Sequence, residues 1–444
     1  MFQPITTGRY PQLILSWLTT LYLTACLLGG LEINYTLQAI VVHSFILLAC
    51  ILLIRQLTLL AGASYLRNRT VSPWSQTEAI PPKISIIVPT YNEQAVIGPA
   101  LLSLLQVNYP NIEIILVDDG SVDNAIHQAK TVLAQHNPND VPCRIIAQTN
   151  GGKANALNTG LIHAEGEFIL CVDADSRLAA DSLRQGIRHF QNPRVAAVAG
   201  NVVVANEVSL LTRCQQLEYQ ISQNFLRQGL AAFGWVTVIP GPIGLFRRSA
   251  LAEVHGYNEN KQLFAEDADL TVRLLAADWL ITSDNQMQAV TEAPNTLTDL
   301  FKQRYRWKRG IYQVLHSNFT TLITAPGLRR PLLAMVLAME SFLLDVLGFG
   351  VVVFMLSNII LLGEVHLLLG WLTLLFFVDL LALLLATPLT QLHQSLPLFI
   401  FQKLTYNFAL QTWGMLALFD EWRASHMTWD KVERVGLPYA GAHS

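Results

Sequence analysis

The chain has 444 residues, of which 52% are hydrophobic and only 14% are charged, and its mean hydropathy is +0.37. Because a soluble domain is about one quarter charged, this composition argues against an entirely soluble protein and indicates segments embedded in a bilayer. The formal net charge of −3 provides no general affinity for nucleic acid, and five cysteines without a CxxC pair indicate neither a zinc site nor a disulfide framework.

Two uncharged apolar segments come first along the chain, at residues 13–30 and 36–54. Each is about long enough to cross a hydrocarbon core of ~30 Å, so we predict two transmembrane helices within residues 1–61. A cleaved signal peptide is the alternative for the first segment. The second segment follows within a few residues, which favours a helical hairpin.

Residues 62–330 are predicted to form an α/β domain, because short segments rich in β-branched residues alternate with amphipathic helical segments. The predicted strands are 84–88, 112–117, 144–147 and 168–172, and the predicted helices include 96–105 and 181–190. This alternation predicts a doubly wound, mostly parallel sheet, which binds its ligands beyond the carboxyl ends of the strands.

The first predicted strand is followed by Thr90, Tyr91 and Glu93. An aromatic ring beside polar groups at a strand end can hold a nucleobase. The alternative is a helix start, in which Thr90 or Asn92 caps the helix and Glu93 lies in its first turn.

The second predicted strand is followed by Asp119. Its carboxylate can accept hydrogen bonds from a uracil imide or a ribose hydroxyl. The alternative is a polar turn, with Gly120 at positive φ and Ser121 as a cap.

Two later groups suit a nucleoside diphosphate. Lys153 follows two glycines and can meet a phosphate, although Ala154 after it departs from the P-loop pattern. Asp173 and Asp175 follow an apolar run, and residues i and i+2 of an extended chain face the same side. Mg²⁺ or Mn²⁺ would relieve their repulsion and bind diphosphate oxygens, whereas a solvated acidic turn is the alternative.

Glu266 and Asp267 precede a helical segment. A carboxylate near an acceptor hydroxyl can act as a general base. The alternative is a pair of acids that favour the helix dipole, and we expect Asp269 to have only that role.

Gln303, Arg306 and Trp307 share one face of a predicted helix through their i, i+3 and i+4 spacing. Arginine suits a diphosphate leaving group, and tryptophan offers a flat apolar platform for a sugar ring. A juxtamembrane belt of basic and aromatic residues is the alternative.

Residues 331–420 are again apolar. Segment 346–363 has no charged residue, 367–388 has only Asp379, and 396–419 has only Lys403. We predict an interfacial helix and two to three transmembrane helices here, followed by a C-terminal tail at 421–444. Asp379 and Lys403 either border a polymer channel or pair two helices.

Basic residues predict the orientation of the chain. Seven lysines and arginines lie between residues 302 and 330, whereas the short loops near Glu32 and Glu364 have none. The positive-inside rule therefore places the central domain in the cytoplasm. Five spans would put the C-terminus outside, against the preference of Arg423, Lys431 and Arg434, which favours one interfacial segment among the C-terminal ones.

Taken in order, these motifs resemble the processive members of glycosyltransferase family 2, which include cellulose, hyaluronan and poly-N-acetylglucosamine synthases. The family pattern of Asp, Asp-x-Asp, Thr-Glu-Asp and Gln-x-x-Arg-Trp is matched by Asp119, by Asp173 and Asp175, by Glu266 and Asp267, and by Gln303, Arg306 and Trp307. Ala265 takes the threonine's place. Residues 238–244 resemble the family's acceptor-side loop, and segments 200–201, 246–253 and 302–307 look closest to poly-β-1,6-N-acetylglucosamine synthases.

The resemblance implies a GT-A-like fold and an inverting transfer from a UDP-sugar, foremost UDP-N-acetylglucosamine, to a growing β-linked polysaccharide, coupled to export. The implied donor-binding residues are Thr90, Tyr91, Glu93, Asp119, Lys153, Asp173 and Arg306. The implied catalytic residues are Asp267 and Glu266, the acceptor-binding residues are Gln303, Trp307 and Gly241, and the ligands of Mg²⁺ or Mn²⁺ are Asp173 and Asp175.

The resemblance also implies a multi-pass protein of the plasma (inner) membrane, with the bilayer and a small membrane accessory subunit among its partners. Two alternatives stay open. One is a non-processive transferase that adds a single sugar to a lipid carrier. The other is a non-catalytic membrane scaffold that retains the fold.

Overall fold

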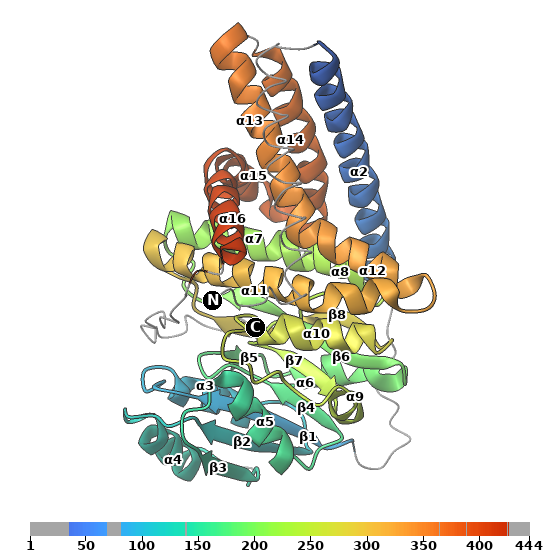
Figure 1. Ribbon diagram of the computed structural model, residues 1–444. Coiled ribbons are helices and arrows are strands. Elements are labelled where there is room, and N and C mark those ends of the chain that lie inside the picture. The colour runs from blue at the N-terminus through green and yellow to red at the C-terminus, as the bar shows by residue number, and fades with distance from the viewer. Residues whose placement is uncertain are drawn as a thin grey trace, which may run out of the picture. The chain divides into compact units, whose positions relative to one another are not determined.

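The computed structural model describes residues 35–68, 81–137, 140–363, 365–387, 389–423 and 425 (Figure 1). Within these ranges the chain divides into two compact units. The sheet unit holds the described residues of 61–300, and the helical unit holds 35–60 and 301–425. The predicted span at 13–30 and nearly all of the predicted tail at 421–444 lie outside the described residues.

The sheet unit is built on eight strands in the order β3-β2-β1-β4-β7-β6-β8-β5. The strands are β1 (Ile84–Thr90), β2 (Ile112–Asp118), β3 (Cys143–Ala147), β4 (Phe168–Cys171), β5 (Arg177–Leu178), β6 (Val195–Val204), β7 (Gly244–Arg247) and β8 (Leu280–Thr291). The four predicted strands are confirmed as β1 to β4.

The sheet is parallel in one half and mixed in the other. β3, β2, β1, β4, β6 and β8 all run in one direction, whereas β7 runs antiparallel to both β4 and β6, and β5 runs antiparallel to β8. The prediction of a mostly parallel sheet is therefore confirmed for six of the eight strands, and the two reversed strands in the second half were not predicted. Helical residues between 210 and 231 connect β6 to β7 through a loop at 235–243, but β7 then runs antiparallel to β6, so this connection is not the crossover of a parallel strand–helix–strand unit.

Helices cover both faces of this sheet. They are α3 (Ile97–Leu105), α4 (Ala125–Gln135), α5 (Lys153–His163), α6 (Ser182–Ile187), η2 (Arg188–Gln191), α7 (Leu210–Ile221), η3 (Ser222–Arg227), α8 (Gln228–Ala231), α9 (Arg248–Glu253) and α10 (Glu266–Ala276). The predicted helices at 96–105 and 181–190 are confirmed as α3 and as α6 with η2.

Strand β1 is apolar at nearly every position because it is buried on both faces. Ile84, Ile86 and Val88 belong to the main core with residues of α3 and α4. Ile87 faces α5, and a Cβ at Gly160 of that helix would lie 2.4 Å from its Cγ2 atom. Glycine at this position therefore lets α5, which begins with Lys153, pack tightly on the strand.

The helical unit contains α2 (Tyr35–Asn68), α11 (Leu297–Thr324), α12 (Arg329–Ala338), η4 (Met339–Leu343), α13 (Leu344–Leu362), α14 (His366–Ala386), η5 (Leu389–Gln391), α15 (Leu392–Phe401), η6 (Gln402–Tyr406) and α16 (Asn407–Trp422). Within the described residues, Ile46–Asn68 and Arg329–Ser357 are long and apolar enough to cross a membrane. A shorter apolar helix covers Leu372–Ala386. Figure 1 shows α13 and α14 running beside α2.

Charged groups in this unit pair across helices. Arg55 of α2 donates two hydrogen bonds of 2.5 Å to the carboxylate of Glu340 in η4. Lys403 Nζ lies 2.5 Å from Asp379 Oδ2 and joins η6 to α14. Of the two interpretations offered for Asp379 and Lys403, helix pairing is the one observed.

Candidate functional site

The Asp173–Asp175 segment follows β4 as a turn. The Ser176 N–H donates to the Asp173 carbonyl at 2.9 Å, and the Ser176 hydroxyl donates to Asp175 Oδ1 at 3.1 Å. The extended conformation on which we based the expectation that both carboxylates face the same side is therefore wrong, because the chain has already turned. Both side chains nevertheless lie at the carboxyl end of β4.

Lys153 connects this turn to the start of α10. Its ammonium lies 2.6 Å from Asp173 Oδ1 and 3.2 Å from Glu266 Oε1. Desolvation by burial opposes the charge, but the carboxylates of Asp173, Glu266 and Asp267 together hold the pKa of Lys153 well above its usual range. The structure thus brings together four of the predicted site residues, with three acids around one lysine.

Asp267 lies in the first turn of α10. Its Oδ1 accepts from the Ala268 N–H at 2.8 Å, and its carbonyl accepts from the Thr271 hydroxyl at 2.6 Å. Burial and the charge of Glu266 raise the pKa of Asp267 to about 6, while Lys153 acts in the opposite direction. A carboxylate with a pKa near neutrality suits a general base.

The loop before β7 closes on the same group. A Cβ at Gly241 would lie 2.8 Å from Lys153 Nζ and 3.1 Å from Asp173 Oδ2. The Ile239 N–H donates to the Thr271 hydroxyl at 3.1 Å, which ties this loop to α10. Gly241 thus lies beside Lys153 and Asp173, and its acceptor-binding role stays a prediction.

Asp119 is 3% exposed and its carboxylate is engaged within the chain. It accepts from the backbone N–H groups of Gly151 and Gly152 at 2.7 and 2.8 Å, and from Gln148 Nε2 at 2.7 Å. Asp119 therefore fixes the two-glycine loop that leads to Lys153. Gly152 has a φ of +91°, a conformation that glycine adopts without strain.

The residues after β1 form a second turn at this edge. Thr90 is buried, whereas Tyr91 and Glu93 are partly exposed. The Ser121 hydroxyl accepts from the Asn92 N–H at 3.0 Å, so Ser121 links the two strand ends. The alternative of a helix capped by Thr90 or Asn92 is wrong for α3, whose N-cap residue is Val96.

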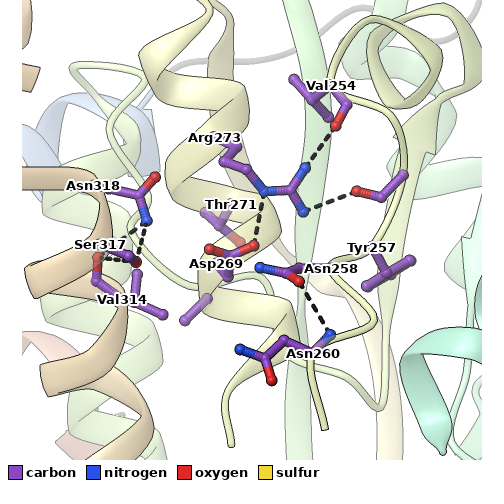
Figure 2. Close-up of polar contacts among 12 residues, drawn as sticks. Val254, Tyr257, Asn258, Asn260, Asp269, Thr271, Arg273, Val314, Ser317 and Asn318 are labelled. Atoms are coloured by element: carbon purple, nitrogen blue, oxygen red, sulfur yellow. Dashed lines mark hydrogen bonds and ion pairs between the residues drawn. The ribbon is translucent and has the colours of Figure 1, made fainter. Parts of the chain in front are cut away.

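Asp269 has a larger structural role than the helix-dipole role expected for it. Its Oδ2 accepts from Arg273 Nε at 2.7 Å, and Arg273 also donates to the carbonyls of Val254 and Gly256 at 2.6 and 2.8 Å. Figure 2 shows this guanidinium reaching from α10 to the chain that leads into it. The contacts join residues up to 19 positions apart, so no local sequence pattern reveals them.

Gln303, Arg306 and Trp307 lie on α11 and belong to the helical unit, whereas the acids and Lys153 belong to the sheet unit. Their segment is helical, as expected. Gln303 is buried, and Trp307 is 37% exposed with the Arg304 guanidinium 4.3 Å from its ring centroid. The predicted site residues are thus described as two groups, one in each unit.

The acids at the strand ends fit a divalent cation that binds together with its substrate. Among the described residues, no group of three or more His, Cys, Asp or Glu side chains could hold a metal ion by itself. Asp173 and Asp175 supply hard oxygen ligands, and Mg²⁺ commonly takes one or two carboxylates and completes its shell with substrate phosphates and water.

Comparison with known proteins gives this arrangement a family. Residues 85–254 match the family model described as glycosyl transferase family 2. Over these residues the chain is similar to family 2 glycosyltransferases. The matched residues contain Asp119, Lys153, Asp173 and Asp175, whereas Asp267 and the α11 group lie beyond them.

Curated relatives extend the match. The chain is 33% identical over 241 residues to the poly-beta-1,6-N-acetyl-D-glucosamine synthase of Staphylococcus epidermidis, and 32% identical over 237 residues to that of Staphylococcus aureus (strain COL). These alignments cover 54% and 53% of this chain and 57% and 56% of the relatives. The chain therefore spans little more than half the length of the curated relatives it matches.

A solved structure supports the fold. The mannosyltransferase PcManGT from Pyrobaculum calidifontis, in complex with GDP-Man and Mn²⁺, matches with a TM-score of 0.58. The match covers 86% of this chain and 98% of that chain at 19% identity. At this identity the likeness establishes the fold alone, a GT-A-like sheet with a mixed half.

Proposed function

We propose that the protein is a membrane-bound, inverting glycosyltransferase that transfers a sugar from a UDP-sugar to a growing β-linked polysaccharide, with UDP-N-acetylglucosamine as its donor. The observation that carries the proposal is the group of Lys153, Asp173, Glu266 and Asp267 at one edge of the sheet. The curated relatives, which are named as synthases of an N-acetylglucosamine polymer, support the choice of donor.

In this proposal Asp267 is the general base. It removes the proton from the acceptor hydroxyl, whose oxygen attacks the anomeric carbon while the bond from that carbon to the diphosphate oxygen breaks. Attack from the side opposite the leaving group inverts the configuration. UDP carries away the electron pair of the broken bond.

Lys153 changes partners during the reaction. In the described structure its ammonium neutralises Asp173 and Glu266. With donor bound, it would move toward the diphosphate and stabilise the charge that develops on the leaving UDP. Asp173 and Asp175 would hold Mg²⁺ or Mn²⁺, which supplies further charge neutralisation on the diphosphate when bound.

The remaining predicted residues divide between donor and acceptor. Thr90, Tyr91, Glu93 and Asp119 lie at the carboxyl ends of β1 and β2, where we place the nucleoside. On the α11 face, Arg306 would meet the diphosphate, and Gln303 and Trp307 would hold the terminal acceptor sugar.

We place the catalytic domain in the cytoplasm and the helical unit in the plasma (inner) membrane, where it would accompany export of the polymer. Two described helices have the length and composition for a span. A small membrane subunit would be an additional partner.

The test is an incubation of purified membranes with a panel of UDP-sugars and Mg²⁺ or Mn²⁺, with UDP release and product size as readouts and Asp267→Asn membranes as the control. Long polymer from UDP-N-acetylglucosamine that is absent in the control supports the proposal. Single-sugar lipid products would identify a carrier transferase instead. No turnover of any donor by folded protein would contradict the enzymatic proposal.

A further inference from the structure

The segment between α9 and α10 delivers Glu266 and Asp267 to the site, and it is fastened at its start. Arg273 holds the carbonyls of Val254 and Gly256 (Figure 2). Further along, the Asn260 N–H donates to Asn258 Oδ1 at 3.1 Å, so the segment also folds on itself. The middle of the segment, at residues 258–261, is exposed, and it is attached to helix α5.

Glu259 makes that second attachment. Its Oε2 accepts from Asn155 Nδ2 at 3.0 Å, and its Oε1 accepts from Asn158 Nδ2 at 2.8 Å. The two asparagines lie one turn apart on α5. Their hydrogen bonds lower the pKa of Glu259, so both of its oxygens are acceptors at neutral pH.

Hydrogen bonds also connect α5 to the residues at the carboxyl ends of the strands. Asn155 Oδ1 accepts from Gln148 Nε2 at 2.8 Å, and that amide also donates to Asp119 Oδ1 at 2.7 Å. Lys261, two residues after Glu259, donates to the Asn150 carbonyl at 3.5 Å. A chain of side-chain hydrogen bonds therefore runs from Asp119, past the first turn of α5, to the segment that precedes α10.

We propose that Glu259 is a positioning residue for sugar transfer: by fastening the segment before α10 to α5, it fixes the spacing between Asp267 and Lys153. This inference rests on the proposed function. The reacting groups sit on different helices, with Lys153 opening α5 and Asp267 in the first turn of α10. Displacement of a reacting group by about 1 Å can lower a rate by roughly 10²-fold, so even a small change in the distance between Asp267 and Lys153 should change the rate measurably.

Glu259→Gln in the full-length protein tests the inference. Glutamine offers one acceptor oxygen in place of two, so one of the two asparagine bonds is lost. We expect kcat with UDP-N-acetylglucosamine to fall about tenfold, within the range that misplacement produces, while KM for the donor and Kd for UDP stay within about twofold. The matched control is Glu253→Gln on α9, whose carboxylate accepts from Trp279 Nε1 at 3.0 Å and is outside this network.

A second readout does not depend on catalysis. Lys261 is exposed, and trypsin cleaves after lysine, so release of the segment should expose this bond. We expect cleavage after Lys261, followed by mass spectrometry, to be faster in Glu259→Gln than in Glu253→Gln. Asn158→Ala keeps the carboxylate but removes three hydrogen bonds to the segment, one to Glu259 and two to the backbone of Tyr257, so it should show both effects to a larger extent.

The outcomes separate this inference from the function on which it rests. Normal turnover by Glu259→Gln with unchanged cleavage would overturn the positioning role and leave the transferase proposal standing. A parallel loss of thermal stability and activity in both network variants would assign Glu259 a purely structural role and also overturn it. Failure of the folded wild-type protein to bind UDP or turn over any UDP-sugar would overturn both proposals together.

Discussion

The two units of this protein use charge differently. At the strand ends of the sheet unit, Lys153 faces three carboxylates, from Asp173, Glu266 and Asp267, and the Arg227 guanidinium also interacts with Asp267, which leaves three acids to two cations. In the helical unit the charges pair one to one, as in Arg55 with Glu340 and Lys403 with Asp379. In a one-to-one pair, each charge is neutralised by its partner in the folded chain. An excess of carboxylates is neutralised only when a cation or a proton binds to them.

The contrast also holds inside the sheet unit. Near the opposite ends of β1 and β2, Lys83 and Arg144 face Glu113 and Glu165, two charges of each sign. The Ser85 hydroxyl donates to the buried carboxylate of Glu113 at 2.6 Å. In this cluster the two positive charges neutralise the two negative ones, and the ion pairs join neighbouring strands. The candidate site differs from it by its excess of negative charge and not by its number of charged groups.

The largest effect is expected at Asp267. Asp267→Asn removes the base without changing the shape of the side chain, so sugar transfer should fall by roughly 10²–10⁴-fold while UDP binding is kept. Rates of UDP release and a UDP titration measure the two quantities. Asp278→Asn is the control, because Asp278 is exposed and its φ of +71° is tolerated by asparagine. Loss of UDP binding by Asp267→Asn alone would argue against the base assignment.

Lys153→Met should lower transfer on the order of 10²-fold, as the loss of a group that stabilises transition-state charge does. The pH profile gives a sharper test. The base is active when deprotonated, and Lys153 lowers the pKa of Asp267 from a value that burial and Glu266 have raised. Removing the ammonium therefore raises that pKa further, and the acid limb of the kcat/KM profile, which reports the free enzyme, should move to higher pH than in wild type. A shift toward lower pH would contradict the charge balance described above.

Asp269 provides the contrast with Asp267 two residues away. Asp269→Ala unpairs Arg273 and weakens its hold on Val254, so it should destabilise the folded protein by roughly 1–3 kcal/mol. Thermal unfolding of the detergent-solubilised chain measures the change. Asp267→Asn should unfold close to the wild-type temperature. If both substitutions had the same effect on unfolding and on transfer, the division between a reacting and a structural carboxylate would fail.

Local sequence patterns predicted the parallel half of the sheet well. Strands β1 to β4 are rich in Ile, Leu and Val, and the polar residues that follow them do lie at one edge. Strand β8 was not predicted, because the consecutive polar residues at 282–286, which include Ser283, Asp284 and Asn285, interrupt its apolar pattern.

The sequence predicted which residues form the site, but it predicted their conformations and contacts less well. The motif order gave Lys153, Asp173, Glu266 and Asp267, which the fold brings together. The turn at Ser176, the burial of Asp119 and the Glu259 attachment were not predicted. Each of the last two depends on partners distant in sequence, such as Asn155 and Glu259, which are 104 positions apart.

The smallest effect is expected for the balanced pair of Asp379 and Lys403. The side chains of Lys403 and Asp379 are 27% and 32% exposed, so removing one partner of this pair should cost only about 1 kcal/mol or less. Asp379→Leu alone should therefore lower the yield of folded protein slightly, and the double variant Asp379→Leu/Lys403→Met should keep both the yield and polymer output within about twofold of wild type. Detergent gel filtration and polymer size report the two quantities. A channel lining predicts something different: the double variant would fold normally and yet make less or shorter polymer, because the polar path itself would be gone.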